Sequence, residues 1–229
     1  MSDFTLLMGN NIALRYDISK MGKNIKKVKL IKSPLNREEK RQLKLDAILR
    51  HAAAAFMEKG YYKTSLDDIA RRYSVTKPTL YYYVKNKEDI LIKCEDVASI
   101  RINGLLDQVT AGPQSGFAQL EDFIKGYVEI VTDDIIRCHI RHRGQREGEL
   151  ARNASLKMHR GIEQRVRKII IKGMADGSIQ NCNSTIIAIL LFDALNGISA
   201  WYRDEGKLNH EELVRQVLLL VTEGVKNKS

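Results

Sequence analysis

Apolar residues recur at helical spacing along nearly the whole chain after Arg37, and this periodicity restricts the fold more than any other feature. No alternating strand pattern longer than a few residues occurs, and proline is absent after Pro113. The first apolar stretch ends at Gly60 and places its inward residues at i, i+3, i+4, i+7 and i+11, namely Leu45, Ile48, Leu49, Ala52 and Phe56. The sequence therefore predicts an all-α fold.

Two short helices joined by a tight turn are expected next. The first opens at Thr64-Ser65, where Ser65 with Asp68, or Thr64 with Asp67, can form a capping box. The turn is Ser74-Val75-Thr76, and the second short helix covers residues 77–84 with Thr76 as its N-cap. This arrangement predicts a helix-turn-helix.

The rest of the chain also reads as helices, without an internal repeat. The expected ranges are 87–109, 117–136, 155–175, 184–202 and a last helix after Asn209. The helix over 184–202 is apolar on most sides, so we expect it to be more buried than a surface helix.

The net charge of +10 is unevenly distributed along the chain. Residues 1–36 hold 7 basic and 2 acidic groups, residues 37–93 hold 13 and 8, and residues 94–229 hold 18 of each. This asymmetry predicts a module that meets a polyanion, joined to one that does not. Nucleic acid is the first candidate partner, and an anionic membrane surface is the second.

Residues 1–36 show no sustained period and contain a lysine-rich run that Ser33-Pro34 closes. We expect a basic, flexible arm. Two interpretations remain open for it. It is either a leader that precedes a start at Met21, or an arm that adds nonspecific phosphate contacts.

Several classes of protein do not fit the sequence. The most apolar stretch, 186–198, is interrupted by Asp193 and is shorter than the ~18 apolar residues of a membrane span. The first twenty residues do not resemble a secretory signal, so we expect a soluble, cytoplasmic protein without a membrane partner. Three separated cysteines predict neither a disulfide framework nor a thiolate zinc site. Enzyme signatures are missing, so we expect no enzymatic activity and no cofactor.

The helix-turn-helix region resembles the DNA-binding domain of TetR-type repressors. The resemblance is carried by Ser65-Leu66-Asp67-Asp68-Ile69-Ala70 and by the stretch from Val75-Thr76-Lys77-Pro78 through Tyr81-Tyr82-Tyr83 to Lys85-Asn86-Lys87. It covers 37–92 and implies a DNA-binding domain there, with a helical ligand-binding and dimerisation domain over 93–229. Ser74 departs from the family, which usually has glycine in this turn.

The resemblance also implies roles for single residues. The start of the second short helix would enter the major groove, and the implied base contacts are Lys77, Pro78 and Tyr81. The implied phosphate contacts are Thr64, Ser65, Thr79, Tyr83 and Lys87. Leu80 and Val84 would face the core, joined by Tyr82.

Residues 193–198, 201–208 and 211–213 are similar to the last two helices of a TetR subset, several members of which control fatty-acid or sterol breakdown and respond to acyl-CoA thioesters. The resemblance implies an effector-binding homodimer whose two recognition helices lie one turn of double-stranded DNA apart, ~34 Å, on a palindromic operator.

Polar and aromatic residues that interrupt the C-terminal helices are candidates for an effector pocket. The candidate ligand-binding residues are Phe123, Tyr127, His139, His142, Arg146, Phe192 and Asn196. The arginine-rich stretch 137–152 is either a solvated face or a receptor for the phosphates of a large anion. Cys138 and His142 would share a helix face, but we predict no metal site.

The sequence therefore predicts a transcription regulator, most simply a repressor released from its operator by a small-molecule effector such as an acyl-CoA thioester. A multidrug-efflux or stress regulator with a hydrophobic cationic effector is the main alternative. A protein that binds DNA without sequence preference is the second alternative.

Overall fold

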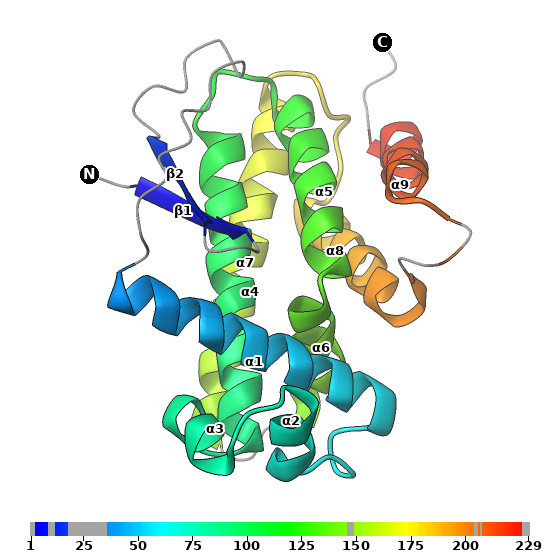
Figure 1. Cartoon of the computed structure of the whole chain (residues 1–229). Helices are drawn as coiled ribbons and strands as arrows, with labels where there is room; N and C mark the ends of the chain where they lie inside the picture. Colours follow the sequence, from blue (N-terminus) through cyan, green and yellow to red (C-terminus); the bar gives the residue numbers. More distant parts are fainter. Residues whose placement is uncertain are drawn as a thin grey trace. The chain divides into compact units, whose positions relative to one another are not determined.

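The computed structural model describes residues 3–8, 12–17, 36–145, 149–203, 206 and 208–225 (Figure 1). The chain divides into two compact units, Met1–Ile48 and Leu49–Ser229.

The first unit contains a β-hairpin that the sequence pattern did not predict. Strand β1 (Asp3–Met8) pairs antiparallel with β2 (Ile12–Asp17), with Asp3 opposite Asp17 and Met8 opposite Ile12. We expected an arm without sustained structure over 1–36, and the two strands depart from this expectation. The missed signal is Gly9-Asn10-Asn11, a cluster of turn-forming residues between two six-residue runs. The lysine-rich run of the arm lies outside the described residues.

Helix α1 (Arg37–Lys59) begins in the first unit and ends in the second. Its start is fixed by a reciprocal cap, in which the Asn36 side chain accepts from the Glu39 amide and the Glu39 carboxylate accepts from the Asn36 amide. In the second unit the predicted inward residues Leu49, Ala52 and Phe56 are buried.

The helix-turn-helix consists of α2 (Leu66–Arg72) and α3 (Lys77–Tyr83). Ser65 and Asp68 form the predicted capping box of α2, and Thr76 caps α3. Between them Ser74 takes a left-handed conformation with φ 55°. The Ser74 amide donates to the carbonyl of Arg71 and the Val75 amide to that of Ala70, which is the Schellman pattern of a helix end.

The remaining helices confirm the expected all-α architecture. They are α4 (Lys87–Thr110), α5 (Gly116–Thr132), α6 (Asp134–His142), a 3-10 turn (Arg143–Gln145), α7 (Glu149–Ala175), α8 (Ser184–Trp201) and α9 (His210–Val225). The single helix expected over 117–136 is divided at Asp133. This residue has an extended backbone, and its side chain accepts from the Ile135 amide to cap α6.

Helix α5 lies at the centre of the second unit and contacts α4, α6, α7, α8 and α9. Its buried face includes Leu120, Ile124 and Val128. The crossing of α5 with α7 is close because Gly116 meets the backbone of Gly173, where an added Cβ would lie 2.1 Å from the Gly173 nitrogen. Asp176 and Ser178, just after α7, accept hydrogen bonds from the first two amides of α5.

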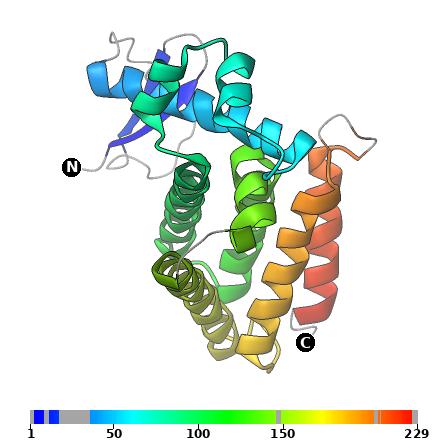
Figure 2. The ribbon, with the colours of Figure 1, turned by 90° about the horizontal axis from the view of Figure 1, so that it is seen from below.

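Helix α8 is less buried than its composition suggested. Leu191, Leu195 and Ile198 are buried, but Ile186, Leu190 and Trp201 are exposed, so the expectation of burial on most sides is wrong for one face. Figure 2 shows α8 and α9, coloured orange and red, at the edge of the helical body. Among the described residues α8 is also the one helix whose length and composition would suffice to cross a membrane, with a mean hydropathy of 1.5. One such helix is weak evidence for a membrane span, and α8 packs on α5, α6 and α7 of the same unit.

Candidate nucleic-acid interface and effector cavity

The short helix α3 has one buried side and one exposed side. Leu80 and Val84 are buried, as expected. Tyr81 and Tyr82 are 53% and 64% exposed, so the inward orientation expected for Tyr82 is wrong. The ring of Tyr82 packs edge-on against Tyr83 instead, with ring centroids 5.0 Å apart. Helix α3 therefore presents a tyrosine-rich surface to its surroundings.

Lys77 and Pro78 lie at the exposed start of α3. The Lys77 ammonium forms an ion pair with Asp67 of α2, with 2.6 Å between Nζ and Oδ2. The hydrogen bond and the negative charge of Asp67 raise the pKa of Lys77. A base or phosphate that binds Lys77 would share the ammonium group with this carboxylate or replace it, so Asp67 would tune the contact that the resemblance implies for the lysine.

The five residues expected to contact phosphate fall into two groups. Ser65, Thr79 and Tyr83 keep part of their surface open to solvent. Thr64 is buried, and its hydroxyl donates to the Gly60 carbonyl at 2.8 Å. Lys87 donates to the Tyr61 carbonyl at 2.8 Å and lies over the Tyr61 ring. The side chains of Thr64 and Lys87 are thus engaged inside the domain.

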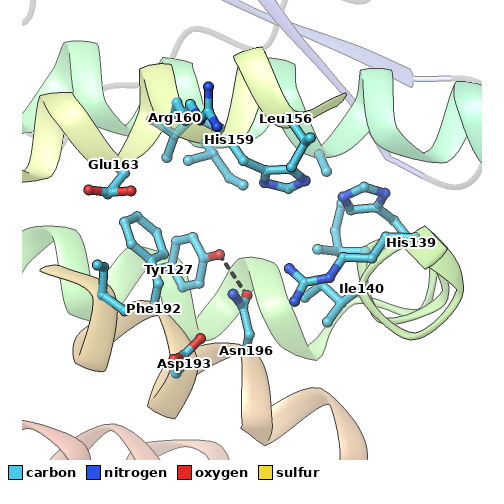
Figure 3. A pocket seen from close by; sticks show the side chains of 16 residues that line it. Tyr127, His139, Ile140, Leu156, His159, Arg160, Glu163, Phe192, Asp193 and Asn196 are labelled. Atoms are coloured by element: carbon cyan, nitrogen blue, oxygen red, sulfur yellow. Dashed lines mark hydrogen bonds between the residues drawn. The ribbon is translucent and has the colours of Figure 1, made fainter. Parts of the chain in front are cut away.

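A cavity of about 260 Å³ opens among α4, α5, α6, α7 and α8 (Figure 3). Of the candidate pocket residues, Tyr127, His139, Phe192 and Asn196 line it together. The buried Tyr127 hydroxyl donates to the Asn196 side-chain oxygen at 2.9 Å, and burial raises the pKa of Tyr127. Phe123 is not among the lining residues but contacts two of them. Its ring centroid lies 5.3 Å from that of Tyr127 and 6.0 Å from that of Phe192.

The cavity wall also carries charge. Arg143 and Arg160 line it, as do the carboxylates Glu163 and Asp193. The sequence did not identify Arg160, Glu163 and Asp193 as lining residues, because a charged residue on an amphipathic helix is usually exposed to solvent. Only the fold shows that these residues of α7 and α8 line the same cavity.

Other candidates lie elsewhere. His142 packs between the rings of Phe56 and Tyr61 and hydrogen-bonds Gln145, away from the cavity. Arg137, in the stretch considered for phosphate binding, is buried, and its guanidinium donates to the carbonyls of Ser199 and Tyr202 at the end of α8. Arg146 and the side chain of Arg152 lie outside the described residues.

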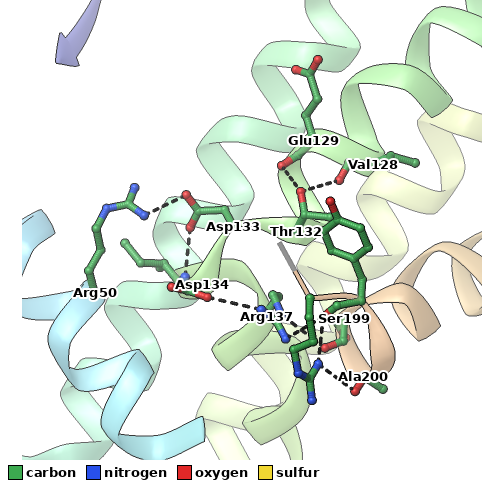
Figure 4. A network of polar contacts seen from close by, with 12 residues as sticks. Arg50, Val128, Glu129, Thr132, Asp133, Asp134, Arg137, Ser199 and Ala200 are labelled. Carbon is green, nitrogen blue, oxygen red and sulfur yellow. Dashed lines mark hydrogen bonds and ion pairs between the residues drawn. The ribbon is translucent and has the colours of Figure 1, made fainter. Parts of the chain in front are cut away.

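An ion-pair network centred on Asp133 joins α1 and α4 to the junction of α5 and α6 (Figure 4). The Asp133 carboxylate accepts from Arg50 of α1 at 3.0 Å and from Arg101 of α4 at 2.9 Å. Burial by itself would raise the pKa of Asp133, but the two guanidiniums outweigh it and the pKa is lowered. The same residue caps α6, so the end of α5, the start of α6 and the two arginine-bearing helices share one anchor.

A helix-turn-helix attached to a helical body with an internal cavity defines a class, the ligand-responsive DNA-binding regulators. Two family models place the chain within that class. "Bacterial regulatory proteins, tetR family" matches residues 48–94, and "Tetracyclin repressor-like, C-terminal domain" matches residues 113–225. The chain belongs to the TetR family of DNA-binding transcriptional regulators.

The similarity to curated relatives is concentrated in a short part of the chain. The transposon Tn10 TetC protein of Escherichia coli is 30% identical over 88 residues, which is 38% of this chain and 44% of that protein. The biofilm operon regulator IcaR of Staphylococcus epidermidis is 46% identical over 48 residues, 21% of this chain and 26% of that protein. The chain thus spans less than half the length of either relative.

Solved structures are similar over most of the chain. The ketosteroid regulator KstR2 of Mycobacterium tuberculosis has a TM-score of 0.73 and 16% identity, covering 81% of this chain and 96% of that one. AibR, solved with isovaleryl coenzyme A and operator DNA, has a TM-score of 0.68 and 20% identity, covering 77% and 96%. At these identities the likeness shows the shared fold.

Proposed function

We propose that this regulator is a homodimeric repressor that a small-molecule effector releases from a palindromic operator. The observation that carries the proposal is α4, which begins at Lys87 directly after the helix-turn-helix and lines the cavity with Ala98 and Ile102. A ligand in the cavity would therefore touch the helix that directly follows the recognition helix in the chain. Differential binding worth ~1–3 kcal/mol between two conformers suffices to shift DNA affinity.

The proposed reading of DNA rests on the exposed surface of α3. Lys77 would donate to acceptor atoms on base edges, Pro78 would contact a thymine methyl, and Tyr81 would lie at the groove edge. Ser65, Thr79 and Tyr83 would hold phosphates and fix the register. Thr64 and Lys87 would act indirectly, since their polar atoms position the loop at 60–65.

The proposed dimer uses the apolar surface that α8 and α9 leave open. Ile186, Leu190 and Trp201 of α8 and Leu219 and Leu220 of α9 are each more than half exposed. A stripe of large apolar residues over two helices is typical of a protein interface. Pairing with the same surface of a second copy would bury it and produce a two-fold dimer.

The proposed effector is an acyl-CoA thioester. Its acyl chain would enter the apolar part of the cavity beside Ile102, Ile136 and Phe192, while Arg143 and Arg160 would meet phosphate oxygens. Of two proteins with the same fold, one is a ketosteroid regulator and the other was solved with isovaleryl coenzyme A and operator DNA. A hydrophobic cation is the second candidate, favoured by Glu163, Asp193 and the aromatic rings of Tyr127 and Phe192 in the same wall.

A DNA-binding assay tests the proposed readout. The operator is first selected from random duplexes with the full chain, and affinity is then measured by fluorescence anisotropy over a range of salt concentrations. Lys77→Ala and Tyr81→Ala should weaken binding by ~1–3 kcal/mol each and relax sequence preference, whereas Lys125→Ala, an exposed lysine on α5, should change neither. Unaltered affinity and preference in both α3 variants would refute the assignment, and equal binding of scrambled duplexes would favour a nonspecific DNA-binding protein.

A thermal-shift screen tests the effector class. Ligands that bind only the folded state raise the melting temperature, so acyl-CoA thioesters of graded length should stabilise the protein more than free CoA or free fatty acids. Arg160→Ala should reduce that shift. Stabilisation by cationic drugs alone would replace the thioester with the second candidate. In either case we infer a cytoplasmic regulator that works by binding and not by catalysis.

A further inference from the structure

Three side chains from three helices converge at one end of the cavity. Glu95 comes from α4, His139 from α6 and His159 from α7. One ligand atom from each lies within 4.8 Å of the others. The His159 Nε2 is 3.9 Å from a Glu95 oxygen, and the two imidazole rings stack with 5.6 Å between centroids.

Two of the three side chains in this cluster are buried, and His159 is partly exposed. Glu95 is 8% exposed and His139 is 3% exposed, and the Nδ1 of His139 and the Nε2 of His159 are shielded from solvent. The Ser155 hydroxyl of α7 donates a hydrogen bond to Glu95 Oε1, the oxygen that also lies nearest His159, and so holds the carboxylate in place. Both histidines also line the cavity, so a fourth position on their open side would face it.

Two imidazoles and one carboxylate are a common ligand set for zinc and other first-row divalent ions. Bonds of ~2.0–2.2 Å in a tetrahedral site place neighbouring ligand atoms ~3.3 Å apart. The present separations of up to 4.8 Å therefore need to close by about 1.5 Å at most, which side-chain rotation can supply.

We propose that Glu95, His139 and His159 bind one divalent transition-metal ion of the zinc class, with the fourth ligand position open to the cavity. The sequence predicted no metal site, and the cluster weighed there was Cys138, His139 and His142. The proposal departs from that prediction, and it keeps only His139 of that cluster. The three ligands occur in separate helices and become neighbours only in the fold. The inference goes beyond the proposed function and does not depend on the effector class.

The test uses the full chain, stripped with a chelator and titrated with Co²⁺. The visible absorption of four-coordinate Co²⁺ should appear with one ion per chain, and Zn²⁺ should displace it. His139→Ala, His159→Ala and Glu95→Gln should each bind more than ~100-fold more weakly, since even loss of an outer partner costs ~10–100-fold. His142→Gln, on the same helix as His139, is the matched control and should bind as wild type does.

A second measurement covers variants that fail to fold. Histidine labelled with ¹⁵N in the wild-type protein should show Zn²⁺-dependent shifts of the ring nitrogens of His139 and His159, with His51, His142 and His210 unchanged. A dissociation constant above about 1 mM for the metal ion and the wild-type chain would overturn the proposal. Metal binding by all three cluster variants as tight as that of wild type would overturn it too.

Discussion

Ser74 adopts a backbone conformation that is unfavourable for a non-glycine residue, because the end of α2 requires it. The left-handed conformation that closes α2 is one that glycine adopts freely and that costs a residue with a Cβ ~1–2 kcal/mol. Because the Ser74 side chain is exposed, the backbone conformation is the main factor that determines which residues this position tolerates. The sequence comparison with TetR-type domains identified the departure, and the backbone retains the left-handed turn despite it.

We expect Ser74→Gly to stabilise the protein by up to ~1 kcal/mol, because the relief of strain exceeds the extra entropy of glycine in the unfolded chain. Ser74→Val should destabilise it by more than ~1 kcal/mol, because a β-branched residue tolerates this conformation poorly. Urea unfolding of both variants measures the difference. A glycine variant less stable than wild type would mean that the serine side chain contributes more than the turn costs.

His142 predicts a pH dependence of stability. Burial lowers the pKa of His142 from 6.5, and the positive charge of Arg141 lowers it further. Hydrogen bonds between His142 and Gln145 and between His142 and the Phe56 backbone oppose this shift but do not cancel it. The unfolded chain therefore binds a proton more readily than the folded one, so stability is retained above pH 6.5 and falls as the pH drops below that value. Urea unfolding from pH 7.5 to 5 should show a steeper loss for wild type than for His142→Gln. Equal slopes would show that other groups dominate.

Gly116 governs how closely two elements approach. A methyl group at this position would overlap the backbone of α7 at Gly173, and neither backbone can move without shifting a whole helix. The sequence shows a glycine at the start of a helix, which by itself suggests only weak helix propensity. The reason for the residue appears only when α5 and α7 are seen in contact.

Gly116→Ala should destabilise the protein by ~2–4 kcal/mol, since overpacking here separates two core helices. Gly161→Ala is the matched control on α7, where the added Cβ meets nothing within 4 Å. It should stabilise the protein by up to ~1 kcal/mol through helix propensity. Thermal unfolding distinguishes the two. Similar melting temperatures for both variants would contradict the close crossing.

Asp133 divides one predicted helix into two, and its removal should affect both. Asp133→Ala should cost ~1–3 kcal/mol through loss of the partly buried pairs with Arg50 and Arg101 and of the cap on α6. Asp133→Asn should cost less, because an amide oxygen still caps the helix. Asp122→Asn, in an exposed pair with Lys125, should cost less than ~0.5 kcal/mol. Equal stabilities of the Ala and Asn variants, measured in urea, would remove the capping role.

At the scale of the molecule, the helical spacing predicted the type and order of the helices from α1 to α9, except that α5 and α6 were expected as one helix. Local signals such as the caps at Ser65 and Thr76 placed the helix-turn-helix. The cavity was only partly predictable, because Arg160 and Glu163 acquire their role from the packing of α7 against other helices. The roles of Thr64 and Lys87 were equally hidden, since their partners are backbone carbonyls that no sequence pattern reveals.

The proposed dimer gives a prediction at the same scale. Leu190→Glu and Leu220→Glu place charges on the open apolar face of α8 and α9 and should shift the protein to a monomer without unfolding it, since both side chains are at least 60% exposed. Operator affinity should fall strongly, because two half-sites are no longer bound together. Sedimentation velocity measures the oligomeric state. A double variant that remains dimeric would place the interface on another surface.

Helix α4 has a mechanical consequence that follows from its length. Its 24 residues form an unbroken rod of about 36 Å. Ile102 lies at the cavity, 15 residues and about 22 Å from the end at Lys87, so a tilt of only about 6° around Ile102 would swing that end by about 2 Å. A small tilt of α4 at the cavity thus moves the start of this helix, next to the helix-turn-helix, by nearly the length of a hydrogen bond. A shift of that size separates a recognition helix that fits the bases from one that does not.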